Sequence, residues 1–145
     1  MSKSDTFEAD ILKLIFNGTA IANLADNAVS SPLTNLYVAL HSGDPGETGT
    51  QETNEVAYTS YARVAVARNS GGWTVSGTAP TQVAPVATVS FPQCTGGSAT
   101  ATHASIGVAS SGASKILYSG ALTPNISISN GVTPELTTSS VITED

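Results

Sequence analysis

The alternation of apolar and polar residues in short runs is the feature that most limits how this chain can fold. In the run NLYVALHS, residues 35–42, the side chains of Leu36, Val38 and Leu40 fall on one face of an extended strand. Similar runs fill the rest of the chain, separated by turn sequences such as NSGG, TGGS and SNGVTP. No helical pattern separates consecutive runs, which disfavours a parallel sheet. About eight such runs predict a mainly β, antiparallel β-sandwich, with a jelly roll as its expected form.

The strands of this sandwich are expected near residues 35–41, 61–68, 86–91, 102–109 and 116–122, with a short strand in GGWTVSG, residues 71–77. Their alternation predicts which side chains form the core. The expected core residues are Leu36, Val38, Leu40, Val64, Val66, Trp73, Val89, Phe91, Ile106 and Leu117.

One helical segment is expected before the strands, over residues 4–28. Asp5 and Glu8 have the spacing of a capping box, and Gly18 can end the first part of the helix. The apolar residues at helical spacing are Phe7, Ile11, Leu14 and Ile15. This face either packs on its own domain or docks on a neighbouring subunit, which makes Phe7 and Ile11 candidate partner contacts. We expect a single domain over residues 1–145, with the sandwich over 33–145.

Charge and composition exclude several kinds of partner. The chain has a net charge of −6, with five Lys and Arg against eleven Asp and Glu, and only 11% of its residues are charged. Nucleic-acid binding is not expected, since it needs clustered cations. No signal peptide and no apolar stretch of about 18 residues is apparent, so neither secretion nor membrane insertion is expected. A surface with few charges can be covered by a protein partner at little desolvation cost.

The residues that could carry chemistry form no recognised catalytic or metal-binding pattern. His41 and His103 stand at strand ends, and a metal site needs three or more converging ligands, so both are expected to bond to neighbours or water. Cys94 is the single cysteine, which excludes an internal disulfide, and a buried thiol is expected. We therefore expect no catalytic residue, no cofactor and no metal. The loop over residues 43–55 is expected to be solvated or to face a partner, with Asp44 and Glu47 as candidate contacts.

Several motifs together resemble a family of small structural proteins of tailed bacteriophages. They are LYVALH at residues 36–41 followed by DPG at 44–46, YARV at 61–64, FP at 91–92, THASIG at 102–107 and LYSGAL at 117–122. The similarity covers nearly the whole chain, from about residue 5 to residue 145, and includes the helical start. It implies a component of the virion, synthesised in the cytoplasm of the host cell.

The resemblance leaves two placements open. A capsid cement, or decoration, protein would bind the major capsid protein and stabilise the expanded lattice, as a homo-oligomeric dimer or trimer on a symmetry axis. A tail, tail-fibre or baseplate component would contact other tail proteins or a receptor. The sequence shows no coiled-coil heptads and no collagen-like repeat, which favours the cement interpretation.

Overall fold

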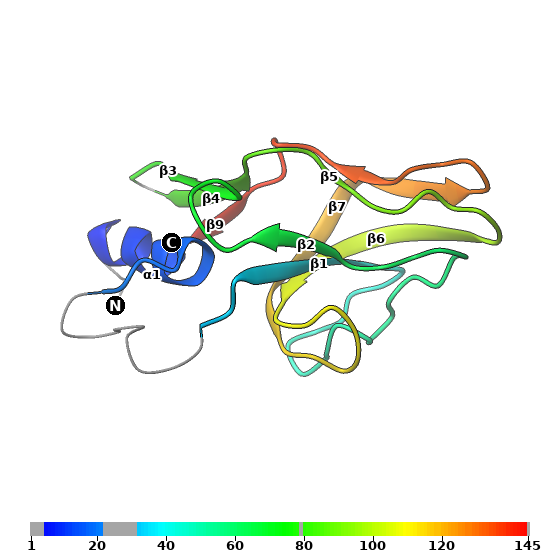
Figure 1. Ribbon diagram of the computed structural model, residues 1–145, viewed down its shortest axis with the longest axis horizontal. Helices are drawn as coiled ribbons and strands as arrows, with labels where there is room; N and C mark the ends of the chain where they lie inside the picture. The colour runs from blue at the N-terminus through cyan, green and yellow to red at the C-terminus, as the bar shows by residue number, and fades with distance from the viewer. Residues whose placement is uncertain (1–4, 22–31, 79, 145) are drawn as a thin grey trace. The chain divides into compact units, whose positions relative to one another are not determined.

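The computed structural model describes residues 5–21, 32–78 and 80–144, and it confirms a mainly β, antiparallel architecture with a helix at its start (Figure 1). The elements in these residues are α1 (Asp5–Asn17), β1 (Asn35–His41), β2 (Val64–Ala67), β3 (Trp73–Ser76), β4 (Thr81–Pro85), β5 (Val89–Ser90), β6 (Ser98–Gly107), β7 (Ile116–Ser129), β8 (Glu135–Leu136) and β9 (Ile142–Glu144). No helix in the described part of the chain is both long and apolar enough to cross a membrane.

The chain divides into two compact units, each assembled from separate stretches of sequence. The first unit comprises Met1–Asn35, Val66–Thr88 and Thr137–Asp145, and the second comprises Leu36–Ala65 and Val89–Leu136. The single domain expected over residues 1–145 stays a prediction.

In the first unit, α1 contacts the sheet β3-β4-β9. The helix buries Glu8, Leu12 and Phe16, which recur every four residues along one stripe. Phe16 meets Trp73 of β3 edge to face, with ring centroids 4.7 Å apart. Strand β4 supplies the buried residues Thr81 and Val83. This packing joins the N-terminal helix to strands more than fifty residues away in sequence.

The expected helical face is shifted relative to the observed one. Ile11, Leu14 and Ile15 are half-buried, while Leu12 and Phe16 are fully buried. The side chain of Phe7 lies outside the described part of the structure. The helix ends at Asn17, and Gly18 follows with φ +65°, the left-handed conformation that closes many helices. Thr19 and Ala20 do not continue the helix, and the expected continuation over residues 22–28 lies outside the described residues.

Arg68 secures the C-terminal end of α1 within this unit. Its guanidinium donates hydrogen bonds to the carbonyl oxygens of Leu14 and Ile15, and at 3.4 Å to that of Leu33. The carbonyls of Leu14 and Ile15 belong to the last turn of α1, where a helix has no backbone donor of its own and where a cation is electrostatically favoured.

The second unit contains β1 from Leu36 onward, β6 and β7 of the four-stranded sheet β2-β1-β6-β7, the first half of β2, and the short pair β5-β8. Strands β1 and β6 run antiparallel from Tyr37 opposite Gly107 to His41 opposite His103. The buried apolar side chains of this unit are Leu36, Val38, Ala39, Leu40, Val56, Tyr58, Val89, Phe91, Cys94, Ala101, Ile106, Ile128 and Leu136. The buried thiol expected for Cys94 is thereby confirmed.

Most of the predicted core is confirmed, and the exceptions lie on edge strands. Leu36, Val38, Leu40, Trp73, Val89, Phe91 and Ile106 are buried. The expectation was wrong for Val64, Val66 and Leu117, which are only half-buried. Val64 and Val66 belong to β2 and Leu117 to β7, the two strands at the margins of the four-stranded sheet. An edge strand has a neighbour on one side only, so its side chains keep more contact with solvent.

The strand boundaries differ from the expected ones at the prolines. The strand expected over residues 86–91 is reduced to β5 (Val89–Ser90), and β4 ends at Pro85. Strand β7 continues through Pro124 to Ser129, beyond the end expected near residue 122. The pairing with β6 shifts there, because Ala101 lies opposite Ile126 while His103 lies opposite Ala121. Residues 122–125 thus form a bulge on an edge strand, where the missing N–H of a proline is tolerated. The described strands form sheets of four, three and two strands, and the jelly-roll topology stays a prediction.

Candidate functional site

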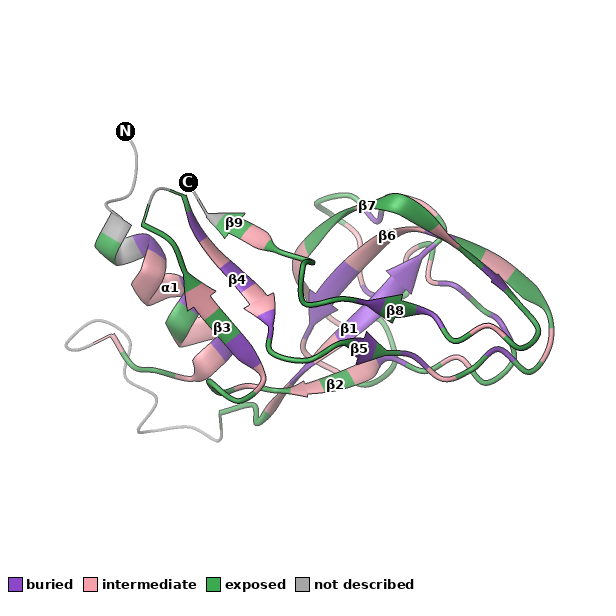
Figure 2. Cartoon of the chain, turned by 90° about the horizontal axis from the view of Figure 1, so that it is seen from above, coloured by how far each residue is buried: buried purple, intermediate pink, exposed green. Residues whose placement is uncertain are grey.

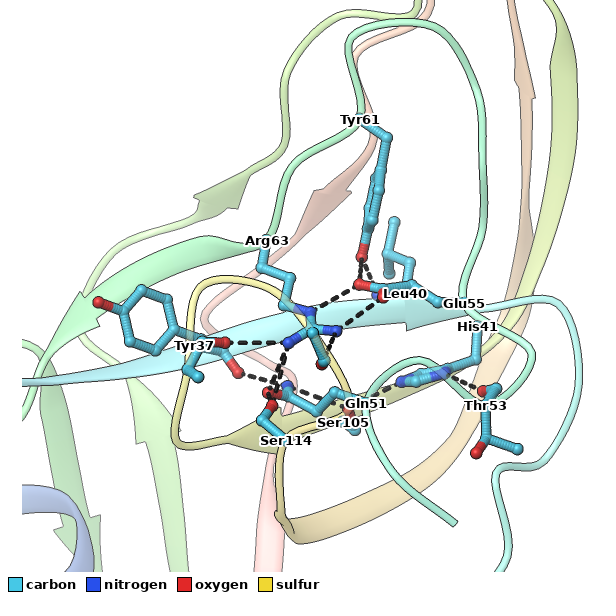
Figure 3. Close-up of polar contacts among 12 residues, drawn as sticks. Tyr37, Leu40, His41, Gln51, Thr53, Glu55, Tyr61, Arg63, Ser105 and Ser114 are labelled. Carbon is cyan, nitrogen blue, oxygen red and sulfur yellow. Dashed lines mark hydrogen bonds and ion pairs between the residues drawn. The ribbon is translucent and has the colours of Figure 1, made fainter.

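A buried polar network in the second unit centres on Arg63, the residue that precedes β2 (Figure 3). Its side chain is 2% exposed and that of its partner Glu55 is 16% exposed. Nε donates to Oε1 of Glu55 at 2.7 Å, and Nη2 donates to Oε2 at 2.8 Å. This two-point contact fixes the plane of the guanidinium and raises the pKa of Arg63, chiefly through the hydrogen bonds to Glu55.

The remaining donors of Arg63 bind the loop that joins β6 to β7, residues 108–115. Nη1 donates to the carbonyl oxygen of Ala109 at 3.1 Å and to Oγ of Ser114 at 3.0 Å. Nη2 donates to the carbonyl oxygen of Gly112 at 2.9 Å. One guanidinium therefore ties this loop to Glu55, which ends the loop over residues 42–55.

Gln51 makes a second connection between the same two loops. It is fully buried, and its Nε2 donates to the carbonyl oxygen of Tyr37 at 3.0 Å. Its Oε1 accepts from Oγ of Ser114 at 2.8 Å, and its backbone N–H donates to the carbonyl of the same serine at 3.0 Å. The side chain lies directly over Gly107, where a Cβ atom would come within 2.2 Å of it. Glycine at position 107 is thus required for Gln51 to lie against the sheet.

His41 anchors the first loop from the end of β1. Nδ1 lies 2.8 Å from the carbonyl oxygen of Thr53, and Nε2 lies 2.8 Å from Oγ of Ser105. The carbonyl can only accept, so Nδ1 carries the proton and Nε2 accepts from the serine. Burial lowers the pKa of His41 below 6.5, and this outweighs the opposite effects of the Thr53 carbonyl and Glu55. The ring is therefore held in its neutral form.

Both histidines bond to protein neighbours, within the expectation of neighbours or water, but His103 lies inside β6 and not at a strand end as expected. Nδ1 of His103 lies 2.9 Å from Oγ1 of Thr102, while His41 bonds to Thr53 and Ser105 as described above.

Tyr61 closes the network above Glu55. Its hydroxyl donates to Oε1 of Glu55 at 2.9 Å and accepts from the backbone N–H of Leu40 at 3.0 Å. Burial raises the pKa of this hydroxyl. The ring of Tyr61 stacks on Phe91, with ring centroids 6.3 Å apart, so this residue links the polar network to the apolar core.

The outer parts of the two loops are exposed, and we refer to them together as the paired-loop surface. Its exposed residues are Ser42, Asp44, Gly46, Glu47, Thr48, Ser110, Ser111, Gly112 and Ala113. Oδ1 of Asp44 accepts from the N–H of Gly46 at 2.8 Å, which fixes the turn, and the Asp44 carbonyl accepts from Nδ2 of Asn54 at 3.0 Å. The surface is thus shaped by local bonds and secured from below by Arg63.

The predicted contact residues belong to different units of the chain. Asp44 and Glu47 lie on the paired-loop surface of the second unit, as expected for exposed loop residues. Ile11 lies half-buried on α1 in the first unit. Among the described residues, no group of three or more His, Cys, Asp or Glu side chains is placed to hold a metal ion.

Part of the loop expected to be solvated is instead buried. Gln51 is fully buried and Glu55 is half-buried in its pair with Arg63, so the interpretation of residues 43–55 as a solvated or partner-facing loop was wrong for these two residues. Sequence reasoning missed these residues because their partners lie up to sixty-three positions away. The signal that could have indicated this network was Arg63, an arginine beside an expected strand in a chain with few charged residues.

Comparison with known proteins assigns the family. Residues 2–144 match the family model described as "Podophage GP4 fiber I protein gp80". Because the match extends over nearly the whole chain, this protein belongs to that family of phage structural proteins, and the resemblance stated from its motifs is confirmed. No curated protein matches the sequence.

We predict that Arg63→Met destabilises the protein by about 3–5 kcal/mol, because it leaves Glu55 and two carbonyl groups without their buried partner. The free energy of unfolding from urea titration measures this cost. Arg63→Lys is the control, since it keeps the charge but loses the two-point contact, and it should fall between wild type and Arg63→Met. A cost below about 1 kcal/mol for Arg63→Met would contradict a central role for this residue.

We also predict a pH dependence that comes from His41. The unfolded chain binds a proton on this histidine at about pH 6.5, and the folded chain binds it only at lower pH. The unfolded state therefore gains protons first as pH falls, and stability drops by up to about 1.4 kcal/mol per pH unit below 6.5. Unfolding free energies of wild type and His41→Asn, compared between about pH 7.5 and pH 5.5, isolate this contribution. Equal slopes for both proteins would refute it.

Proposed function

We propose that this protein is a fiber component of a podophage virion that acts as a rigid contact module and has no catalytic role. The family match supports a phage structural protein, and the family description favours the tail-fibre placement over the capsid. The paired-loop surface is the part of the second unit that we propose contacts a neighbouring virion protein or a host receptor.

The observation that carries this proposal is the fixation of two exposed loops by one buried guanidinium. Arg63 bonds to Glu55 at the end of one loop and to Ala109, Gly112 and Ser114 of the other. A surface that is already ordered loses little conformational entropy when it binds. Exposed loops on a rigid scaffold are a frequent place for recognition.

The polar groups inside the network support a structural rather than a catalytic role. The guanidinium uses all three of its nitrogen atoms on protein acceptors, and both ring nitrogens of His41 are engaged. Both oxygens of Glu55 accept from Arg63. These side chains are thus oriented toward one another and toward the loops they support.

A capsid cement protein on the lattice of the major capsid protein is the second candidate function. The observation that favours it is the low content of charged residues, 11% of the chain, which suits a surface that lies against other subunits. In this role a homo-oligomer would bind the expanded lattice and stabilise it by linkage. Under either function Ile11 and Phe7 of α1 are proposed as further partner contacts.

The copy number in purified particles distinguishes the two functions. We predict that the protein is present at a small fraction of the copies of the major capsid protein and remains with tails after tails and heads are separated. Stained-gel band intensities divided by mass give this ratio. A ratio near one, with the band remaining on DNA-filled heads, would establish the cement function instead.

Substitutions on the paired-loop surface test its role as a contact. We predict that Thr48→Lys/Ser111→Lys leaves the fold intact, because both side chains are exposed, but lowers either incorporation into particles or adsorption to host cells at least about tenfold, equivalent to 1.4 kcal/mol. The matched control is Thr74→Lys/Thr133→Lys, with the same charge change at exposed positions elsewhere. If the loop variant incorporated and adsorbed like the control, the contact role of this surface would be refuted.

A further inference from the structure

His41 is the last residue of β1, a strand that is buried along most of its length (Figure 2). The ring is fully buried, and it bonds both to β6 and to the loop over residues 42–55. Its Nδ1–H donates to the carbonyl oxygen of Thr53 in that loop, and its Nε2 accepts from Oγ of Ser105 in β6 (Figure 3). A neutral ring thus connects the loop to the sheet.

A second proton on this ring would disturb the bonds around Ser105. Nε2 of His41 would become a donor, so the hydroxyl hydrogen of Ser105 would lose its acceptor. Nε2 of Gln51 also lies 3.4 Å from Oγ of Ser105, and this amide nitrogen can only donate. Ser105 is 2% exposed, and a buried hydroxyl without an acceptor costs free energy. The geometry of the closed loop therefore favours the neutral ring.

The charged groups around His41 disfavour a positive charge on its ring. Glu55 lies opposite His41 in a β-bridge, but both of its oxygens accept from Arg63. Arg63 is positive, and so is His103, which lies opposite His41 in β6, when it is protonated. Burial of the ring lowers the pKa of His41, and Arg63 and His103 act in the same direction. The other carboxylates of the loop are exposed to solvent and belong to Asp44, Glu47 and Glu52.

The loop is the segment that can move away from the ring. A buried imidazolium regains its hydration only if one of the segments that cover it is displaced. Strand β6 is held by backbone pairing with β1 and with β7. The loop over residues 42–55 contains no Val, Leu, Ile, Met or aromatic residue, so mainly polar bonds hold it in place. Segments with few buried apolar contacts are the first to open locally.

We propose that protonation of His41 opens the loop over residues 42–55 locally, so that the paired-loop surface is fixed near neutral pH and loosened in mildly acidic solution. The exposed ring binds a proton at about pH 6.5 and the buried ring only at lower pH. The opening equilibrium therefore shifts by up to about tenfold per pH unit below 6.5. The effect of this opening on binding rests on the proposed function, whereas the opening itself does not.

Amide hydrogen exchange of the full chain between about pH 7.5 and pH 5.5, corrected for the intrinsic exchange rate, tests the proposal. The informative amides are the hydrogen-bonded ones of Ser42, Gln51 and Thr53. In wild type their protection should be lower than that of the ladder between β1 and β6, and it should fall by up to about tenfold per pH unit below 6.5. In His41→Asn, which keeps a donor toward Thr53 but cannot be protonated, it should stay nearly constant. His103→Asn, at the other histidine of the chain, is the matched control and should respond to pH like wild type.

Loop protection that does not vary with pH in wild type, the same pH dependence in His41→Asn, or loop amides protected as strongly as the ladder would each overturn the proposal. If His41→Asn does not fold, long-range ¹H–¹⁵N correlation spectra of the wild-type ring give its tautomer and protonation at each pH. Loss of loop protection should then follow protonation of His41, and loss without it would refute the mechanism. Exchange is measured on the isolated protein, so its outcome is independent of the contact role, which the lysine variants of the paired-loop surface test separately.

Discussion

The buried pair of Arg63 and Glu55 is the interaction on which the arrangement of the second unit depends. Removing two charges from water costs free energy that offsets much of their mutual attraction. Such a pair therefore contributes less to net stability than its short distances suggest. Its effect lies in geometry. A guanidinium has a fixed planar set of donors, and here these donors reach both oxygens of Glu55 and three positions of the loop 108–115. Together with Gln51, which also bonds to Ser114, this side chain fixes how the two loops lie relative to each other.

Arg68 applies the same chemistry in the first unit, where it bonds to carbonyl groups at the end of α1. Arg63 and Arg68 are the two arginines of the chain. Both use their donors on protein acceptors, so the positive charge left on the described surface comes mainly from Lys13 and Lys115, which are exposed. The described surface therefore has little positive charge, partly because both arginines bond to acceptors within the protein.

The sequence predicted the parts of the fold that depend on local pattern. Alternation located β1, and it identified Leu36, Val38 and Leu40 as core, but it did not reveal that Ala39 and His41 on the opposite face are buried as well. The same reasoning overestimated the burial of Val64 and Val66, since alternation does not reveal which strands lie at the margin. The polar network was not predictable, because Arg63 meets Ala109 and Gly112 through contacts forty-six and forty-nine positions apart. Asp44 and Glu47 were predictable as exposed, since their loop contains glycine and proline and no large apolar side chain.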